Sequence, residues 1–104
     1  MNRVKIVLAA LIAACAVAPT VARAITDENL RIKNVGVQEN TGYVRFETPT
    51  SVACAYGVVY FDLGTDGGRS ILATVMSAHL AGKPLSRIDY ALVGGNCNAS
   101  LVEF

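Results

Sequence analysis

One histidine is the residue of this sequence best suited to acid–base catalysis. His79 lies near the end of a segment with an apolar stripe, where an imidazole beside a nucleophile would act as a general base. The same position is typical of a histidine that favours the negative end of a helix dipole. We expect this second role, because the sequence has no other histidine to complete the common zinc-binding sets.

Three aspartates, Asp62, Asp66 and Asp89, are the candidate carboxylates of a small hydrolase. Two carboxylates that flank a scissile bond can divide the roles of acid and base between them. Arg69 and Arg87 lie close by in the sequence, so ordinary ion pairs are the competing explanation, and the one we favour. The sequence therefore predicts a protein that is not an enzyme and uses no cofactor and no metal. A periplasmic hydrolase that uses these carboxylates is the alternative.

A glycine-rich run at residues 64–68, Gly-Thr-Asp-Gly-Gly, precedes the striped segment. It is superficially similar to a phosphate-binding loop, but it lacks the lysine of a P-loop and the spacing of a dinucleotide fingerprint. Its aspartate would also repel phosphate. We therefore expect Thr65 or Asp66 to cap a helix.

Four tyrosines, Tyr43, Tyr56, Tyr60 and Tyr90, form the candidate binding surface. All four fall on expected strands, and an exposed tyrosine can stack on a sugar or anchor a protein partner. Tyrosines are also ordinary residues of the core and edges of a sheet, and this second explanation stays open. A glycan or protein partner is therefore expected, with its identity unspecified by the sequence.

Alternating and apolar segments predict five strands and one helix around these residues. Strands are expected over residues 30–37, 43–48, 52–62, 85–93 and 97–104, and the helix over residues 69–80. A bulge is expected near residues 33–36 and a second near Gly57. The turn over residues 38–42 would use Asn40 and Gly42, Gly82 would end the helix, and residues 25–29 would be a loose lead-in.

The amino terminus has the three parts of a cleavable export signal. Asn2, Arg3 and Lys5 form a cationic head, residues 6–18 are apolar, and small residues lead to cleavage after Ala24. We thus expect a signal peptide over residues 1–24, a single small α+β domain over residues 25–104, and a periplasmic or secreted protein. No membrane span would remain.

The alternative for this segment is a lipoprotein signal. Residues 11–15 resemble a lipobox, in which Cys15 would carry lipid and anchor the protein to the envelope. Against it, the apolar run continues beyond Cys15.

Removing residues 1–24 changes both charge and cysteine content. Six basic residues face eight acidic ones, so a precursor of net charge +1 becomes a mature chain of −2. That balance argues against nucleic-acid binding. Cys54 and Cys97 are the two cysteines left, and such a pair in an exported chain predicts a disulfide. Closing that loop would stabilise so small a domain by about 4 kcal/mol.

Several short segments resemble those of small exported bacterial proteins: residues 54–56 (Cys-Ala-Tyr), 80–83 (Leu-Ala-Gly-Lys), 88–90 (Ile-Asp-Tyr) and Cys97. The order β-β-β-α-β-β is similar to that of the receptor-binding subunits of bacterial multi-subunit toxins. This resemblance implies a five-stranded antiparallel OB-like barrel or curved sheet, and self-association into a homo-oligomer. No sugar-binding motif of those subunits is present. The sequence therefore predicts an exported, non-enzymatic binding or assembly module.

Overall fold

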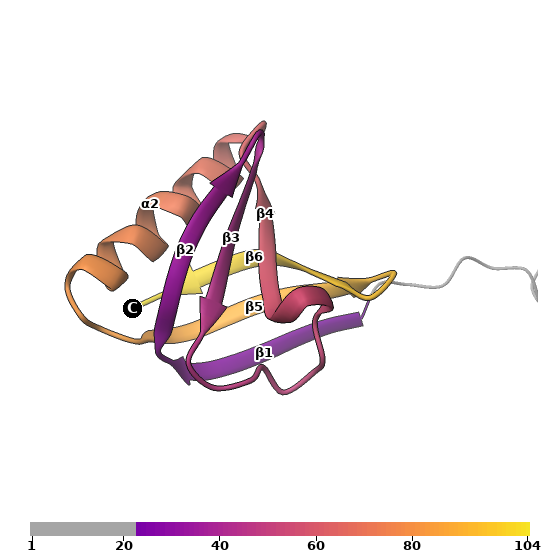
Figure 1. Ribbon diagram of the computed structural model, residues 1–104, viewed down its shortest axis with the longest axis horizontal. Helices are drawn as coiled ribbons and strands as arrows, with labels where there is room; N and C mark the ends of the chain where they lie inside the picture. Colours follow the sequence, from indigo (N-terminus) through magenta and orange to yellow (C-terminus); the bar gives the residue numbers. More distant parts are fainter. Residues whose placement is uncertain (1–22) are drawn as a thin grey trace, which may run out of the picture.

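The computed structural model describes residues 23–104, which fold into one six-stranded sheet with an α-helix packed against it (Figure 1). The elements in chain order are β1 (Arg23–Leu30), β2 (Ile32–Gln38), β3 (Thr41–Phe46), the 3-10 turn η1 (Ala55–Gly57), β4 (Val58–Asp62), α2 (Asp66–Leu80), β5 (Leu85–Val93) and β6 (Asn96–Glu103). The expected signal peptide, apart from its last two residues, and Cys15 lie outside the described residues. No helix within residues 23–104 is long and apolar enough to cross a membrane.

The α+β class, the single long helix and the Cys54–Cys97 disulfide agree with the prediction, but the expected five antiparallel strands need correction. The strand order is β1-β5-β6-β4-β3-β2, and β4 pairs with β6 in parallel. Helix α2 explains this pairing, because it carries the chain away from the end of β4 before the β5–β6 hairpin returns. The two edge strands are separated by Arg31 alone, yet within the described chain they do not pair with each other, so the sheet is not closed.

The prediction that residues 25–29 form a loose lead-in is wrong, because they belong to β1. This strand pairs with β5, and the hydroxyl of Thr26 donates to a carboxylate oxygen of Asp89 at 2.7 Å. Edge strands with one exposed face need few apolar residues, so hydropathy gives little sign of this one. Ala24 pairs with Ala91, which places the expected cleavage point inside β1.

In the β2–β3 hairpin the predicted bulge is confirmed by a register shift between Ile32 and Asn34. The predicted turn is confirmed in part: it consists of Glu39 and Asn40, but the positive φ, 55°, falls on Glu39. Gly42 instead lies in β3, where a side chain would collide with the ring of Phe61. The absence of a side chain at this position serves packing and not the turn.

The strand predicted over residues 52–62 is shorter than expected, because only Val58–Asp62 is extended. Tyr56 and Gly57 both have positive φ, 58° and 67°, which turns the chain immediately before β4. Gly57 therefore belongs to the η1 turn and makes no bulge. The following β4 is nevertheless central, with Val58, Val59 and Phe61 all buried.

Helix α2 begins and ends close to the predicted residues. Thr65 is the N-cap, and its hydroxyl accepts a hydrogen bond from the amide of Gly68 at 3.0 Å. At the other end the amides of Gly82 and Lys83 donate to the carbonyls of His79 and Ala78. This is a Schellman motif, with Gly82 in the left-handed conformation at φ 67°.

The hydrophobic core lies between α2 and the inner face of the bent sheet, whose β2–β3–β4 half runs across its β1–β5–β6 half (Figure 1). Its buried members are Leu30, Ile32, Val44, Phe46, Val59, Phe61, Val75, Ala78, Leu85, Ile88, Tyr90 and Cys97. All six strands therefore contribute side chains to one continuous core, β1 only through Leu30 and the half-buried Ile25. The opposite face of β3 and β4 does not take part in this core.

Candidate functional site

The outer face of β3 and β4 gathers three of the four candidate tyrosines around one open pocket of about 240 Å³. We call this surface the tyrosine face. Its residues are Gln38, Tyr43, Arg45, Tyr56, Val58 and Tyr60. Tyr43 and Tyr60 are direct cross-strand partners, as are Arg45 and Val58. Alternation explains the arrangement, because Val44 and Val59 point into the core and their neighbours therefore point outward.

Tyr43 is fixed in position by a glycine on the neighbouring strand. Gly36 pairs with Tyr43, and a side chain at Gly36 would collide with the tyrosine ring. The ring therefore lies across the backbone of β2. This packing leaves Tyr43 half-buried and restricts the position of its ring at the base of the tyrosine face.

Tyr56 is the exposed tyrosine of the face, with 85% of its surface accessible. Its backbone is left-handed, φ 58° and ψ 10°, which is an outlier for a bulky residue. Such strain persists only where the surrounding structure enforces it, and it gathers at functional sites. An exposed aromatic residue held in a strained conformation is thus a strong candidate for ligand contact.

Contacts with β1, with β6 and with the β5–β6 turn hold the β3–β4 loop (residues 47–57) and explain how Tyr56 is held. The amide of Ser51 donates to a carboxylate oxygen of Asp27 at 3.1 Å. The disulfide from Cys54 to Cys97 ties the loop to β6, with a Cα–Cα distance of 5.4 Å. The amide of Ala55, next to Tyr56, donates to the carbonyl of Gly95 at 2.9 Å.

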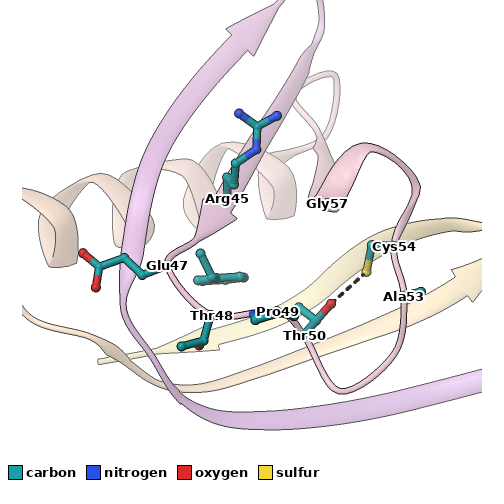
Figure 2. Close-up of a pocket in the computed structure, with 9 residues that line it drawn as sticks. Arg45, Glu47, Thr48, Pro49, Thr50, Ala53, Cys54 and Gly57 are labelled. Atoms are coloured by element: carbon teal, nitrogen blue, oxygen red, sulfur yellow. Dashed lines mark hydrogen bonds between the residues drawn. The ribbon is translucent and has the colours of Figure 1, made fainter.

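A second pocket, of about 320 Å³, lies between the β3–β4 loop and the end of β3 (Figure 2). Its lining residues are Arg45, Phe46, Glu47, Thr48, Pro49, Thr50, Ala53, Cys54 and Gly57. We call it the loop pocket. Arg45 lines both the loop pocket and the tyrosine face, so the two hollows meet at this residue.

Arg45 has no acidic side chain of the described residues within 4.0 Å of its guanidinium. The ion pairs within residues 23–104 join Arg31 to Glu47, Arg69 to Asp66 and Arg87 to Asp89. Figure 2 shows Glu47, the first residue after β3, pointing away from Arg45. Sequence reasoning missed Arg45 as a site residue, although its outward phase with Tyr43 was visible in the alternation.

Tyr90 does not belong to the site, and its place in the candidate binding surface is corrected. Only 1% of it is exposed, and its hydroxyl donates to Asp27 at 2.6 Å. Burial and this hydrogen bond raise the pKa of Tyr90. Burial also acts to raise the pKa of Asp27, but the hydrogen bonds from Ser51 and Tyr90 outweigh it and hold that pKa below its usual value. Tyr90 is thus a core residue that supports the loop through Asp27.

The three carboxylates of the hydrolase hypothesis each have a structural contact. Asp62 accepts from the amide of Gly64 at 2.8 Å, and Asp66 pairs with Arg69. Asp89 forms two hydrogen bonds with Arg87, at 2.8 and 3.0 Å, and these lower its pKa together with the hydroxyl of Thr26. Asp62 and Asp66 lie around the start of α2, whereas Asp89 lies on β5. Among residues 23–104 no group of three metal-ligating side chains occurs.

His79 is exposed in the last turn of α2 and lines an apolar groove between that helix and β2. The groove has a volume of about 260 Å³. Its lining residues are Val35, Gly36, Val37, Leu72, Met76, His79 and Leu80. Leu80 exposes 82% of its surface and Val37 exposes 54%. The groove is therefore an exposed hydrophobic surface, separate from the tyrosine face.

Comparison with family models, curated proteins and solved structures finds no match to this chain. The candidate site therefore rests on its own geometry: three clustered tyrosines, an arginine that lacks an acidic partner within residues 23–104, and a loop held rigid by a disulfide.

Proposed function

We propose that this protein is an exported, non-enzymatic module that binds a saccharide on its tyrosine face. The observation that carries the proposal is the convergence of Tyr43, Tyr56 and Tyr60 on one open pocket with Arg45 and Gln38. Within the described residues no side-chain hydrogen bond occupies the hydroxyls of these three tyrosines. Rings that can stack, and free donors and acceptors beside them, suit a sugar, which has apolar and hydroxyl-bearing surfaces.

The topology supports this choice of face, on the further proposal that the fold is a variant of the OB fold. If β1 and β2 count as one strand bent at Arg31, the chain has five strands with the helix between the third and fourth. In that count β3 and β4 are the second and third strands. This face of OB folds binds oligonucleotides and oligosaccharides. A net charge of −2 after signal removal disfavours the first, which leaves oligosaccharides.

Export to the periplasm or medium is part of the same proposal. The disulfide is expected to persist only in an oxidising compartment, and the sequence of residues 1–24 has the pattern of a cleavable signal. Intact mass of the secreted protein tests this directly. A chain that starts at Ile25 agrees with the proposal, whereas a lipid adduct on Cys15 indicates the lipoprotein.

A saccharide array probed with the mature protein tests the binding proposal. Tyr56→Ala should weaken binding at least about tenfold, as expected for a tyrosine at the centre of an interface. Phe104→Ala is the matched control, because Phe104 is an exposed ring (51%) at the other end of the chain and lines neither pocket. Absence of any saccharide ligand, or equal effects of the two substitutions, would refute the proposal.

A second proposal, self-association, rests on the apolar groove beside β2. The outer edge of β2 has no strand partner within the described residues, and Val37, Met76 and Leu80 are exposed next to it. Two copies could pair their β2 strands antiparallel about a twofold axis and cover both grooves. Light scattering should then show a dimer that Leu80→Asp disrupts; a monomer at all concentrations would contradict the proposal.

A further inference from the structure

We infer that the saccharide bound at the tyrosine face carries a carboxylate, and that this group pairs with Arg45 where the tyrosine face and the loop pocket meet. This inference rests on the proposed function and makes it specific. It names the chemical class of the ligand, an acidic sugar, and the residue that recognises its charge.

The first step of the argument is the electrostatic state of Arg45. Three other arginines of the described residues, Arg31, Arg69 and Arg87, each have an acidic partner within 4.0 Å. The exposed Lys33 and Lys83 have none, but they lie in solvent. Arg45 is half-buried and has none among the described residues. A partly buried guanidinium without a counter-charge is unfavourable unless water or a ligand supplies hydrogen bonds, and it prefers a bidentate carboxylate.

The second step is the place of Arg45 between two hollows. Because Arg45 lines both, an anionic group bound there would have aromatic rings on one side and the loop pocket on the other. The loop pocket offers the hydroxyl of Thr48, whereas that of Thr50 already donates to the carbonyl of Val52 at 2.6 Å and can only accept from a ligand. A ligand longer than one sugar unit could thus lie on the tyrosines, pair with Arg45 and continue toward the threonines.

The third step distinguishes an acidic sugar from an acidic peptide. A peptide that binds by strand addition would need backbone partners from an unpaired strand edge. Both β3 and β4 are interior strands with neighbours on each side, so the tyrosine face offers rings and side chains only. A peptide therefore cannot bind this face by strand addition, whereas rings that stack beside a single cation suit the apolar and carboxylate surfaces of an acidic sugar.

The test uses matched ligands and a matched pair of variants. The mature protein is first screened against carboxylated and neutral oligosaccharides. Binding by calorimetry then compares an oligosaccharide that carries a single uronic acid unit, or any carboxylated ligand found in the screen, with its methyl ester. We expect the acid to bind about tenfold to a hundredfold more tightly, the range of one charge-assisted hydrogen-bonded contact, and the difference to shrink at high salt.

Arg45→Gln should remove that preference, while Arg45→Lys should restore part of it by returning the charge without the bidentate geometry. Lys83→Gln removes one positive charge away from both pockets of the site and should leave the preference intact. Thermal melting of each variant separates loss of binding from loss of folding. If Arg45→Gln does not fold, the acid–ester comparison on the wild-type chain and on Arg45→Lys decides.

The outcomes separate the two proposals. Equal binding of the acid and its ester, or a screen in which only neutral saccharides bind, overturns this inference but leaves saccharide binding in place. Binding of acidic peptides in preference to acidic sugars also overturns it. No saccharide ligand of either kind overturns both.

Discussion

The backbone strain at Tyr56 leads to a prediction in which stability and binding change in opposite directions. Replacing Tyr56 by glycine removes the ring and also allows the left-handed backbone without strain. Replacing it by alanine removes the ring but keeps the strain. Because 85% of Tyr56 is exposed, both variants lose little buried surface, and their comparison isolates the backbone effect.

The expected magnitude follows from two opposing effects. A left-handed conformation costs an L-residue about 1–2 kcal/mol. Glycine removes this cost but loses about 0.5–1 kcal/mol of stability itself, because it has more conformational freedom in the unfolded chain. The free energy of unfolding of Tyr56→Gly should therefore exceed that of Tyr56→Ala by about 0.5–1 kcal/mol. The corresponding melting temperature should be higher by about 2–8 °C.

The assay is urea unfolding of the oxidised mature protein, followed by circular dichroism, with saccharide binding measured on the same samples. Gly57→Ala is a useful counterpart, since Gly57 has φ 67° and open space around a new Cβ atom. It introduces strain and should lower the free energy of unfolding. Both Tyr56 variants should bind equally weakly, because each lacks the ring.

Two results would refute this reasoning. If Tyr56→Gly is no more stable than Tyr56→Ala, then the backbone at this position is not strained or the loop relaxes freely. If Tyr56→Gly binds as tightly as the unaltered protein, the ring does not contact the ligand, and the strain at this position serves some other purpose.

Three further predictions concern the scaffold. In thermal melts Gly67→Ala should stabilise α2 by about 0.5–1 kcal/mol, because the new methyl group meets open space; Gly68→Ala should destabilise the fold, since its methyl group would collide with the backbone carbonyl that ends β4. Replacing both Cys54 and Cys97 by alanine opens a link with a sequence separation of 43 and should lower the free energy of unfolding by about 4 kcal/mol, measured by urea titration. Despite burial, hydrogen bonds hold the pKa of Asp27 below its ordinary value, so its contribution to stability is complete above about pH 4 and is lost as the pH falls through the lowered pKa. Asp27→Asn should flatten this acid limb of the stability curve, and an unchanged limb would contradict the assignment.

The elements that the sequence predicted well are those with local signals. Helix α2 combines an apolar stripe with Thr65 at its start and Gly82 at its end. The β5–β6 hairpin has Gly94 and Gly95, both with positive φ, at its turn. The disulfide was predictable by counting, because removal of the signal leaves a single cysteine pair.

Non-local pairing explains most of the errors. β1 is polar and is held by β5, a partner about sixty residues away, so its own residues do not predict it. The parallel contact of β4 with β6 depends on where α2 returns the chain. Neither is encoded in a short window of sequence.

The candidate site was partly predictable from strand phase. Tyr90 lies two residues after Ile88, a core residue, so it shares the inward face and is buried. Tyr43 lies next to the buried Val44 and therefore points outward. Applying that phase rule would have removed Tyr90 and added Arg45. The left-handed backbone of Tyr56 could not have been foreseen, because it is imposed by the disulfide and by the contact of its neighbour with the β5–β6 turn.

The single residue between β1 and β2 has a consequence for how the domain resists misassembly. Arg31 alone separates the two edge strands, β1 and β2. A shift in the register of β1 along β5 must therefore also shift β2 along β3, at the opposite edge of the sheet. A slip by one residue turns every side chain of a strand to the wrong face. Thr26 and Asp27 anchor one strand by side-chain hydrogen bonds, and the bulge at Ile32 locks the other. The register of each edge strand therefore restrains that of the other. A substitution that weakens either anchor should promote aggregation through both strand edges.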